Sequence, residues 1–196
     1  IMLVDSRQMI YAARLGKYAV GCFNTSDLEI TKAIILAAQA QNSPVIVATS
    51  EKAIAYAGLE TLAETVKIEA KKAKVPIALH LDHGTSLAVV ESCLEAGFTS
   101  VMLDASDNDL ENNIILTRQA VEMAHAKDIP CEGELGLLGK AGQSPNKLTN
   151  PDDVLEFIQH TGVDYLAISI GSTHGIGQKE KLDLELLKKI NGLTGL

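Results

Sequence analysis

The sequence predicts an α/β fold, a (β/α)8 TIM barrel of which about six βα units are present. Six short apolar runs alternate along the chain with segments of helical periodicity. Polar residues follow these runs where each strand would end. An open doubly wound sheet has the same alternation, but it gathers mainly the strand ends beside its switch point. A barrel brings all of them to one rim, so we favour the barrel.

The six predicted strands are rich in β-branched and small apolar residues and are bounded by Gly, Pro, Asn or Ser. Their near-continuous apolar content is typical of strands buried on both faces, as in a parallel sheet. They span residues 18–24, 44–50, 76–83, 100–106, 130–136 and 165–171.

The segments between the strands carry helix signals. Ser26 and Glu29 have the spacing of a capping box at the start of the first intervening helix. Apolar residues recur near helical spacing in residues 59–73 and form one stripe that can lie on a sheet. Asn150 and Pro151 predict an N-cap followed by proline at the first helical position.

Chain length bears on the domain organisation. An eight-unit barrel needs about 250 residues, whereas this sequence has 196. Residues 181–196 resemble a sixth helix and the approach to a seventh strand, and six units alone would leave two apolar sheet edges exposed. We therefore expect residues 1–196 to be a single TIM-barrel domain, incomplete at the C-terminus and part of a longer chain.

Composition limits the possible partners and the compartment. The formal net charge of -8 disfavours nucleic acid and anionic membranes, which select basic surfaces. Small phosphorylated ligands remain compatible, because backbone N–H groups bind phosphate without side-chain charge. Cys22, Cys93 and Cys131 have no disulfide spacing, which indicates a reducing cytoplasm and three small buried side chains. No apolar run approaches the length of a membrane span.

Two histidines are the strongest metal-ligand candidates. His83 and His174 each follow a predicted strand and precede a glycine. Neutral imidazole is a common zinc ligand, and a barrel mouth can bring two strand ends to one ion. Either histidine alone is better explained as a hydrogen-bonded loop residue. The pair, with acids nearby, favours a metal site.

Asp82 immediately precedes His83, and successive strand residues point to opposite faces. Both can reach one site only if the strand is ending, which Gly84 permits. An acid beside a metal, but not bound to it, suits general acid–base catalysis. The alternative role is an N-cap for the next helix, but Thr85 and Ser86 already offer that.

Further polar residues end the neighbouring strands. Inward carboxylates at the strand ends would be costly to bury without a cation or a shared proton, and we favour a metal-binding role for Asp104 and Glu134. Glu132 lies two residues before Glu134 and its role stays open, whereas His80 fits a hydrogen-bonded core histidine. No lysine lies inside or at the end of a predicted strand, which argues against a Schiff-base aldolase.

Taken together, these motifs resemble the class II, zinc-dependent fructose-bisphosphate and tagatose-bisphosphate aldolases. The motifs that carry the resemblance are "YAVGCFN", "SPVIVATS", "ALHLDHG", "SVMLDAS", "CEGELG" and "TGVDYLAISIGSTHG", in family order. The resemblance implies a (β/α)8 barrel that assembles as a homodimer or homotetramer. It implies a cytoplasmic enzyme of glycolysis and gluconeogenesis.

The resemblance also implies residue roles. Asp82 matches the catalytic acid/base. The metal-site residues are His83 and His174 for the catalytic zinc, and Asp104 and Glu134 for a second, divalent or monovalent, cation position. The substrate-binding residues are Asn24, Ser50 and the phosphate-binding Gly175. Two features depart from the family: its third zinc histidine would lie beyond Leu196, and residues 136–153 form a shorter loop without the family's acidic cluster.

The implied reaction is reversible retro-aldol cleavage of fructose 1,6-bisphosphate to dihydroxyacetone phosphate and glyceraldehyde 3-phosphate. Three alternatives stay open. One is an aldolase for tagatose 1,6-bisphosphate or another ketose phosphate, and the second is a metal-dependent barrel hydrolase or epimerase. The third is a non-catalytic barrel relative. The expected partners are small phosphorylated ketoses and trioses, without nucleic acid or membrane.

Overall fold

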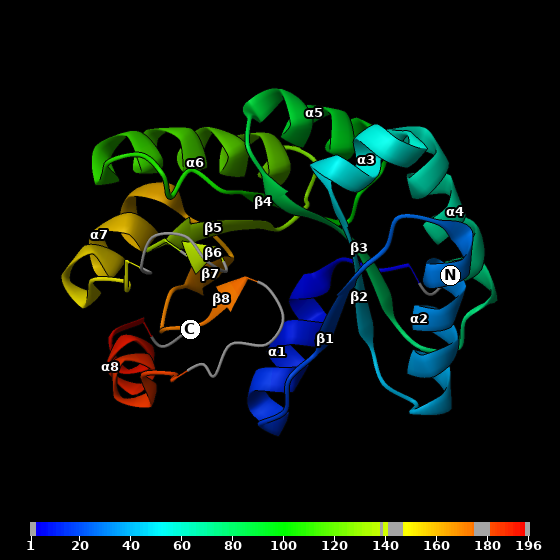
Figure 1. Cartoon of the computed structure of the whole chain (residues 1–196), viewed down its shortest axis with the longest axis horizontal. Helices are drawn as coiled ribbons and strands as arrows, with labels where there is room; N and C mark the ends of the chain where they lie inside the picture. Colours follow the sequence, from blue (N-terminus) through cyan, green and yellow to red (C-terminus); the bar gives the residue numbers. More distant parts are fainter. Residues whose placement is uncertain (1–2, 138, 141–146, 175–180, 195–196) are drawn as a thin grey trace.

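The computed structural model describes residues 3–137, 139–140, 147–174 and 181–194 (Figure 1). Six parallel strands form one sheet in the order β1-β2-β3-β4-β5-β7. The strands are β1 (Gly21–Asn24), β2 (Val45–Ser50), β3 (Ile77–Gly84), β4 (Ser100–Leu103), β5 (Cys131–Leu135) and β7 (Tyr165–Ile168). Each coincides with a predicted strand, so the six-stranded half-barrel is confirmed.

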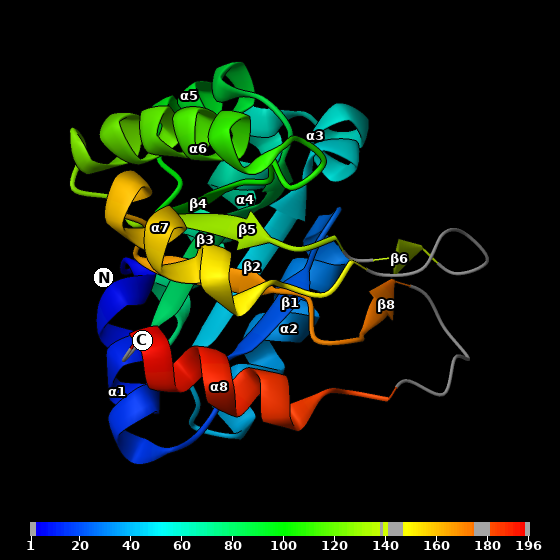
Figure 2. The ribbon, with the colours of Figure 1, turned by 90° about the vertical axis from the view of Figure 1, so that its left-hand side faces the viewer.

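Helices connect the strands, and all of them except the first, α1, cover one face of the sheet (Figure 2). They are α1 (Ser6–Gly16), α2 (Leu28–Ala40), α3 (Glu51–Ala57), α4 (Leu59–Lys72), α5 (Leu87–Glu95), α6 (Leu110–His125), α7 (Pro151–Thr161) and α8 (Leu184–Thr194). Within the described residues, no helix combines the length and the apolar character needed to cross a membrane.

The helix boundaries confirm one predicted cap and correct another. Asn150 caps α7 and accepts a hydrogen bond from the Asp152 N–H at 3.2 Å. The predicted capping box at Ser26 is wrong, because Asp27 caps α2 and accepts from the Ile30 N–H at 2.7 Å. Asp27 accepts from the third helical residue, the position that an N-cap side chain reaches.

The end of the described chain also differs from the expectation. Helix α8 confirms the predicted sixth helix, but it continues to Thr194, so the described residues 181–194 contain no approach to a seventh strand after it. Ile190 is buried in the main core and α8 packs against α7, which extends the helix through this segment.

Side-chain alternation divides the sheet into two faces. On the outer face, Val47, Leu79 and Leu81 join the main core with the covering helices. On the inner face, Ile46 and Ala78 pack against Met9 of α1. Helix α1 therefore fills the interior below the strand ends, and the carboxyl ends of the strands remain available for a site.

The three cysteines differ in burial. Cys93 and Cys131 are buried as expected, and burial raises the pKa of each thiol to about 12. Cys22 is exposed, so its predicted burial is wrong. It lies on β1, which is an edge strand of the six-stranded sheet.

A β-bulge interrupts β3 near its carboxyl end. Leu81 pairs with Val101 and Gly84 pairs with Leu103, so two residues of β3, Asp82 and His83, face one residue of β4. His83 has a positive φ of 50°. The expectation that the strand ends at His83 is wrong, because pairing resumes at Gly84 after the bulge.

A second, two-stranded parallel sheet lies beyond the carboxyl ends of the main strands (Figure 2). It pairs β6 (Gly139–Lys140) with β8 (Thr173–His174), with Gly139 opposite Thr173 and Lys140 opposite His174. The sequence does not predict these strands, because two residues are too few for a periodic pattern. The pairing fixes the backbone of His174.

Replacing Gly84 with alanine is predicted to destabilise the protein. A Cβ at Gly84 would lie 2.7 Å from the Met102 carbonyl oxygen and 2.8 Å from Leu81 Cδ2. Relieving this contact should cost about 1–3 kcal/mol of unfolding free energy, measured by urea denaturation. Gly192→Ala in α8 is the matched control, because its Cβ would meet nothing within 4 Å. The control should gain about 0.5–1 kcal/mol, and equal stabilities for the two variants would contradict the prediction.

Candidate metal and proton-transfer site

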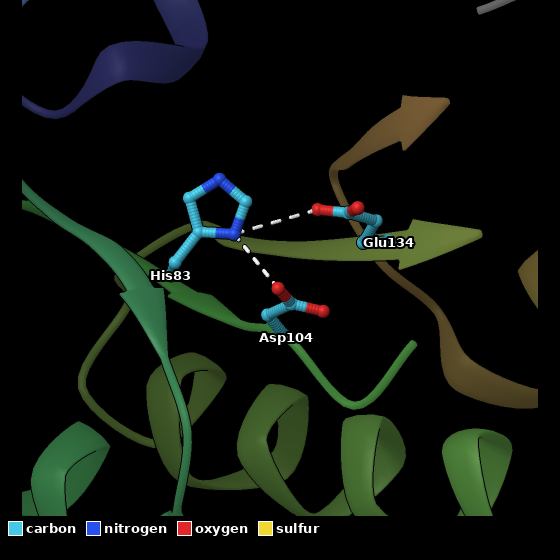
Figure 3. Close-up of side chains that lie close together, drawn as sticks. All are labelled: His83, Asp104 and Glu134. Atoms are coloured by element: carbon cyan, nitrogen blue, oxygen red, sulfur yellow. Dashed lines mark hydrogen bonds and ion pairs between the residues drawn. The ribbon is translucent and has the colours of Figure 1, made fainter. Parts of the chain in front are cut away.

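Three side chains that can bind a metal ion converge at the carboxyl ends of neighbouring strands (Figure 3). His83 comes from the bulge of β3, Asp104 directly follows β4, and Glu134 belongs to β5. His83 Nδ1 lies 2.7 Å from Asp104 Oδ2 and 3.6 Å from Glu134 Oε2. One ligand atom from each residue lies within 4.8 Å of the others. We call these residues the metal-ligand group.

The local backbone explains this convergence. On an unbroken strand His83 would share the outer face with Leu81, which packs against the helices. The bulge turns it toward the inner face, where Glu134 lies. The Asp104 N–H donates to the Gly84 carbonyl at 2.8 Å, which holds the end of β4 beside the bulge. Ser106 donates to Asp104 Oδ1 from its N–H at 3.1 Å and its hydroxyl at 2.7 Å.

The three residues of the metal-ligand group shift one another's pKa values. The hydrogen bond to Asp104 and the surrounding carboxylates raise the pKa of His83 to about 9, although burial opposes this shift. Burial alone would raise the pKa of Asp104, but hydrogen bonds from His83 and Ser106 outweigh it and lower that pKa. Burial and the nearby Asp104 raise the pKa of Glu134 to about 7.

The burial of Glu134 indicates whether the metal-ligand group can bind a cation. Its side chain is 3% exposed, and within the described part of the chain its Oε2 is buried without a hydrogen-bond partner. A buried carboxylate oxygen in that state is costly unless a cation or a proton compensates it. One imidazole and two carboxylates are ligands that a divalent transition metal accepts. The donor set therefore fits a divalent cation.

Asp82 lies beside the metal-ligand group but is not a member of it. Its Oδ1 is 4.0 Å from His83 Nε2, on the other side of the imidazole from Asp104. Its Oδ2 accepts a hydrogen bond from Asn24 Nδ2 at 2.7 Å. Asp82 can therefore exchange a proton with a ligand at the strand ends while the metal-ligand group binds a cation.

The remaining predicted residues have different positions. Ser50 lies beside Asp82 in the sheet register, and its hydroxyl caps α3 by accepting from the Ala53 N–H at 3.3 Å. The backbone of His174 belongs to β8, but its side chain lies outside the description. Gly175 lies outside the described residues.

His80 and Glu132 form a second polar layer deeper in the inner face. His80 is buried, with Nδ1 2.8 Å from Ser100 Oγ and Nε2 3.6 Å from Glu132 Oε2. The prediction of a hydrogen-bonded core histidine is confirmed for His80. Glu132, whose role stayed open, faces His80. Burial and the nearby Asp82 raise the pKa of Glu132 to about 7.

Sequence reasoning missed Glu51, the first residue of α3. Glu51 Oε1 accepts from the Thr85 N–H at 2.5 Å and from the Thr85 hydroxyl at 2.8 Å. An acid in the first turn of a helix is common, so the sequence carries no signal for this contact.

We expect buried His80 to make the protein less stable as the pH falls. Burial lowers its pKa from 6.5 to about 4, so between these values the unfolded chain binds more protons than the native protein. Its contribution to stability is therefore complete above pH 6.5 and declines toward pH 4. Between pH 7 and pH 5, wild type should lose about 2 kcal/mol more unfolding free energy than His80→Gln, measured by urea denaturation. Equal losses for the two proteins would contradict this prediction.

Comparisons with known proteins agree with the family resemblance seen in the sequence motifs. A family model described as "Fructose-bisphosphate aldolase class-II" matches residues 4–195. A fructose-bisphosphate aldolase of Geobacillus stearothermophilus is 42% identical over 204 residues, covering 99% of this chain and 70% of the relative. One from Thermus caldophilus is 44% identical over 180 residues, covering 89% of this chain and 59% of the relative.

A solved structure of an aldolase also has a similar fold. The crystal structure of the YdjI aldolase from Escherichia coli K12 matches with a TM-score of 0.90 and 33% identity, over 100% of this chain and 70% of that one. The chain thus spans between 59% and 70% of the length of these three proteins. With nearly every residue inside the family match, the chain belongs to the class II fructose-bisphosphate aldolase family.

Proposed function

We propose that the protein containing this chain cleaves fructose 1,6-bisphosphate reversibly to dihydroxyacetone phosphate and glyceraldehyde 3-phosphate. One observation carries the proposal: Asp82 lies beside His83 but outside the group formed by His83, Asp104 and Glu134. An acid next to a metal site but separate from it is what a metal-assisted aldol cleavage requires. The family is one of metal-dependent lyases, and its members act on phosphorylated sugars.

Zn²⁺ is the proposed cofactor. His83 and His174 would hold the catalytic ion, and Asp104 and Glu134 would hold a second, divalent or monovalent, cation. When bound, zinc supplies Lewis acidity at the carbonyl of the ketose. The buried Glu134 Oε2, which accepts no hydrogen bond from the described residues, and the closeness of His83 to Asp104 and Glu134 support cation binding at this end of the barrel.

Asp82 is the proposed general base and acid. It removes the proton from the C4 hydroxyl of the open-chain ketose as the C3–C4 bond breaks, so that C4 becomes the carbonyl carbon of the aldehyde product. The electron pair of the broken bond passes to the enediolate of the other fragment, which takes up a proton at C3 to give dihydroxyacetone phosphate. In the condensation direction Asp82 returns its proton to the aldehyde oxygen. The amide of Asn24 donates to one oxygen of Asp82, which orients the carboxylate. Asn24, Ser50 and Gly175 are the proposed substrate-binding residues, with backbone amides and hydroxyls for the phosphates.

The proposal extends to the domain and its assembly. Residues 1–196 would be part of a single TIM-barrel domain that further βα units close between β7 and β1. Two apolar cavities support this. One of about 480 Å³ is lined by Tyr11, Leu166 and Ile190 beside β7, and one of about 500 Å³ by Phe23 and Ile34 beside β1. We propose a cytoplasmic homodimer or homotetramer that uses phosphorylated ketoses and trioses, without nucleic acid or membrane partners.

Removing the metal is predicted to abolish cleavage. The natural full-length protein should lose fructose 1,6-bisphosphate cleavage after exhaustive chelation and regain it when zinc is added, because no lysine lies within or directly after the six described strands of the main sheet to form a Schiff base. The assay is coupled detection of triose phosphate, with metal content measured in the same samples and tagatose 1,6-bisphosphate tested in parallel. Faster cleavage of the tagatose isomer would change the substrate and leave the reaction class intact.

Two outcomes would contradict the proposal. Full activity in protein verified as metal-free would remove zinc from the reaction. A zinc-loaded protein that cleaves neither ketose would indicate a non-catalytic relative of the family.

A further inference from the structure

We propose that Glu51 is a positioning residue for the reaction: it holds the β3 bulge in the conformation that brings Asp82 and His83 to one site. This inference rests on the proposed function. Glu51 does not belong to the metal-ligand group, and it acts through Thr85.

The contact between Glu51 and Thr85 joins two neighbouring βα connections. Glu51 begins α3, directly after β2, and Thr85 directly follows β3. One carboxylate oxygen accepts both donors of Thr85, the backbone N–H at 2.5 Å and the hydroxyl at 2.8 Å. Helix α3 packs beside β3 (Figure 1). The position of Thr85 is therefore tied to the start of α3.

The bulge needs such support because its backbone is unfavourable. His83 has a φ of 50°, a region that residues other than glycine seldom adopt. Backbone of this kind persists where the surrounding structure constrains it from several sides. On the β4 side, Gly84 pairs with Leu103 and its carbonyl accepts from the Asp104 N–H.

On the β2 side, two consecutive residues hold the two ends of the bulge. Ser50 lies opposite Asp82 in the sheet, and Glu51 binds Thr85. The segment from Asp82 to Thr85 is thus held at both ends by the junction between β2 and α3. Without Glu51 the end that carries Gly84 and Thr85 would lose this tether, and the imidazole of His83 would lose its fixed direction.

The alternative is that Glu51 contributes only to stability, as an acid favourably placed in the first turn of α3. The two roles predict different measurements. A purely structural residue changes the melting temperature of the folded protein but not its zinc affinity or its kcat at 25 °C. A positioning residue changes all three.

The test compares four variants of the natural full-length protein. Glu51→Ala removes the acceptor, and Glu51→Gln keeps an amide oxygen that can accept both bonds. Thr85→Val removes the hydroxyl and keeps the N–H. Glu60→Ala is the matched control, an exposed acid in the first turn of α4. Each protein is measured for zinc affinity by competition with a chelating dye, for kcat and KM, and for melting temperature.

We expect Glu51→Ala to lower kcat and weaken zinc binding by about tenfold each, with KM changed by less than about threefold. Glu51→Gln should stay within about threefold of wild type, Thr85→Val should lose about threefold, and Glu60→Ala should match wild type. Wild-type zinc affinity in Glu51→Ala would overturn the proposal. If that variant does not fold, wild-type affinity and kcat in Thr85→Val would overturn it.

The zinc measurement keeps the two proposals separate. If wild type binds zinc but cleaves no ketose, the proposed function fails, and the relative zinc affinities still decide the role of Glu51. If wild type is active and all four variants bind zinc equally well, the proposed function stands and the role of Glu51 is overturned.

Discussion

Successive side chains on an unbroken strand point to opposite faces of its sheet, so an ordinary β3 would bring only one of Asp82 and His83 inside the barrel. The bulge between Leu81 and Gly84 removes this restriction. His83 then turns toward Asp104 and Glu134, and Asp82 remains on the inner face beside Asn24. The joint action of the site depends on this one irregularity, because it brings a proton-transfer group and a metal ligand together.

Burial of the carboxylates is the second constraint. Glu134 is nearly inaccessible, and it shares the inner face with Asp104 and Glu132. Carboxylates crowded in this way raise the free energy of the folded protein unless a cation or protons neutralise them. The raised pKa values of Glu134 and His83 reflect this, since one group tends to keep its proton and the other gains one. A divalent cation can neutralise these carboxylates in place of the protons, which His83 and Glu134 would release when the ion binds.

Sequence patterns were sufficient for the six strands and for the residues at their ends. Alternating apolar runs identify parallel strands, and polar residues that end such runs in a barrel must share one rim, which brought Asp82, His83, Asp104 and Glu134 together in the prediction. The bulge was not predictable, because it is a shift in the pairing of β3 with β4 that leaves no periodic pattern in the sequence. The Glu51–Thr85 contact and the β6–β8 pairing were also missed, since both depend on tertiary placement of residues that have no distinctive local pattern.

In the proposed mechanism, Asp82 transfers the proton and the adjacent His83 holds the metal. A paired measurement on Asp82→Ala and His83→Ala tests this division of roles. Zinc content and turnover of fructose 1,6-bisphosphate are measured on the same samples of each full-length variant. We expect Asp82→Ala to retain wild-type zinc content and to lose at least about a hundredfold in turnover, whereas His83→Ala should lose both. Loss of zinc from Asp82→Ala, or near wild-type turnover in that variant, would contradict this division of roles.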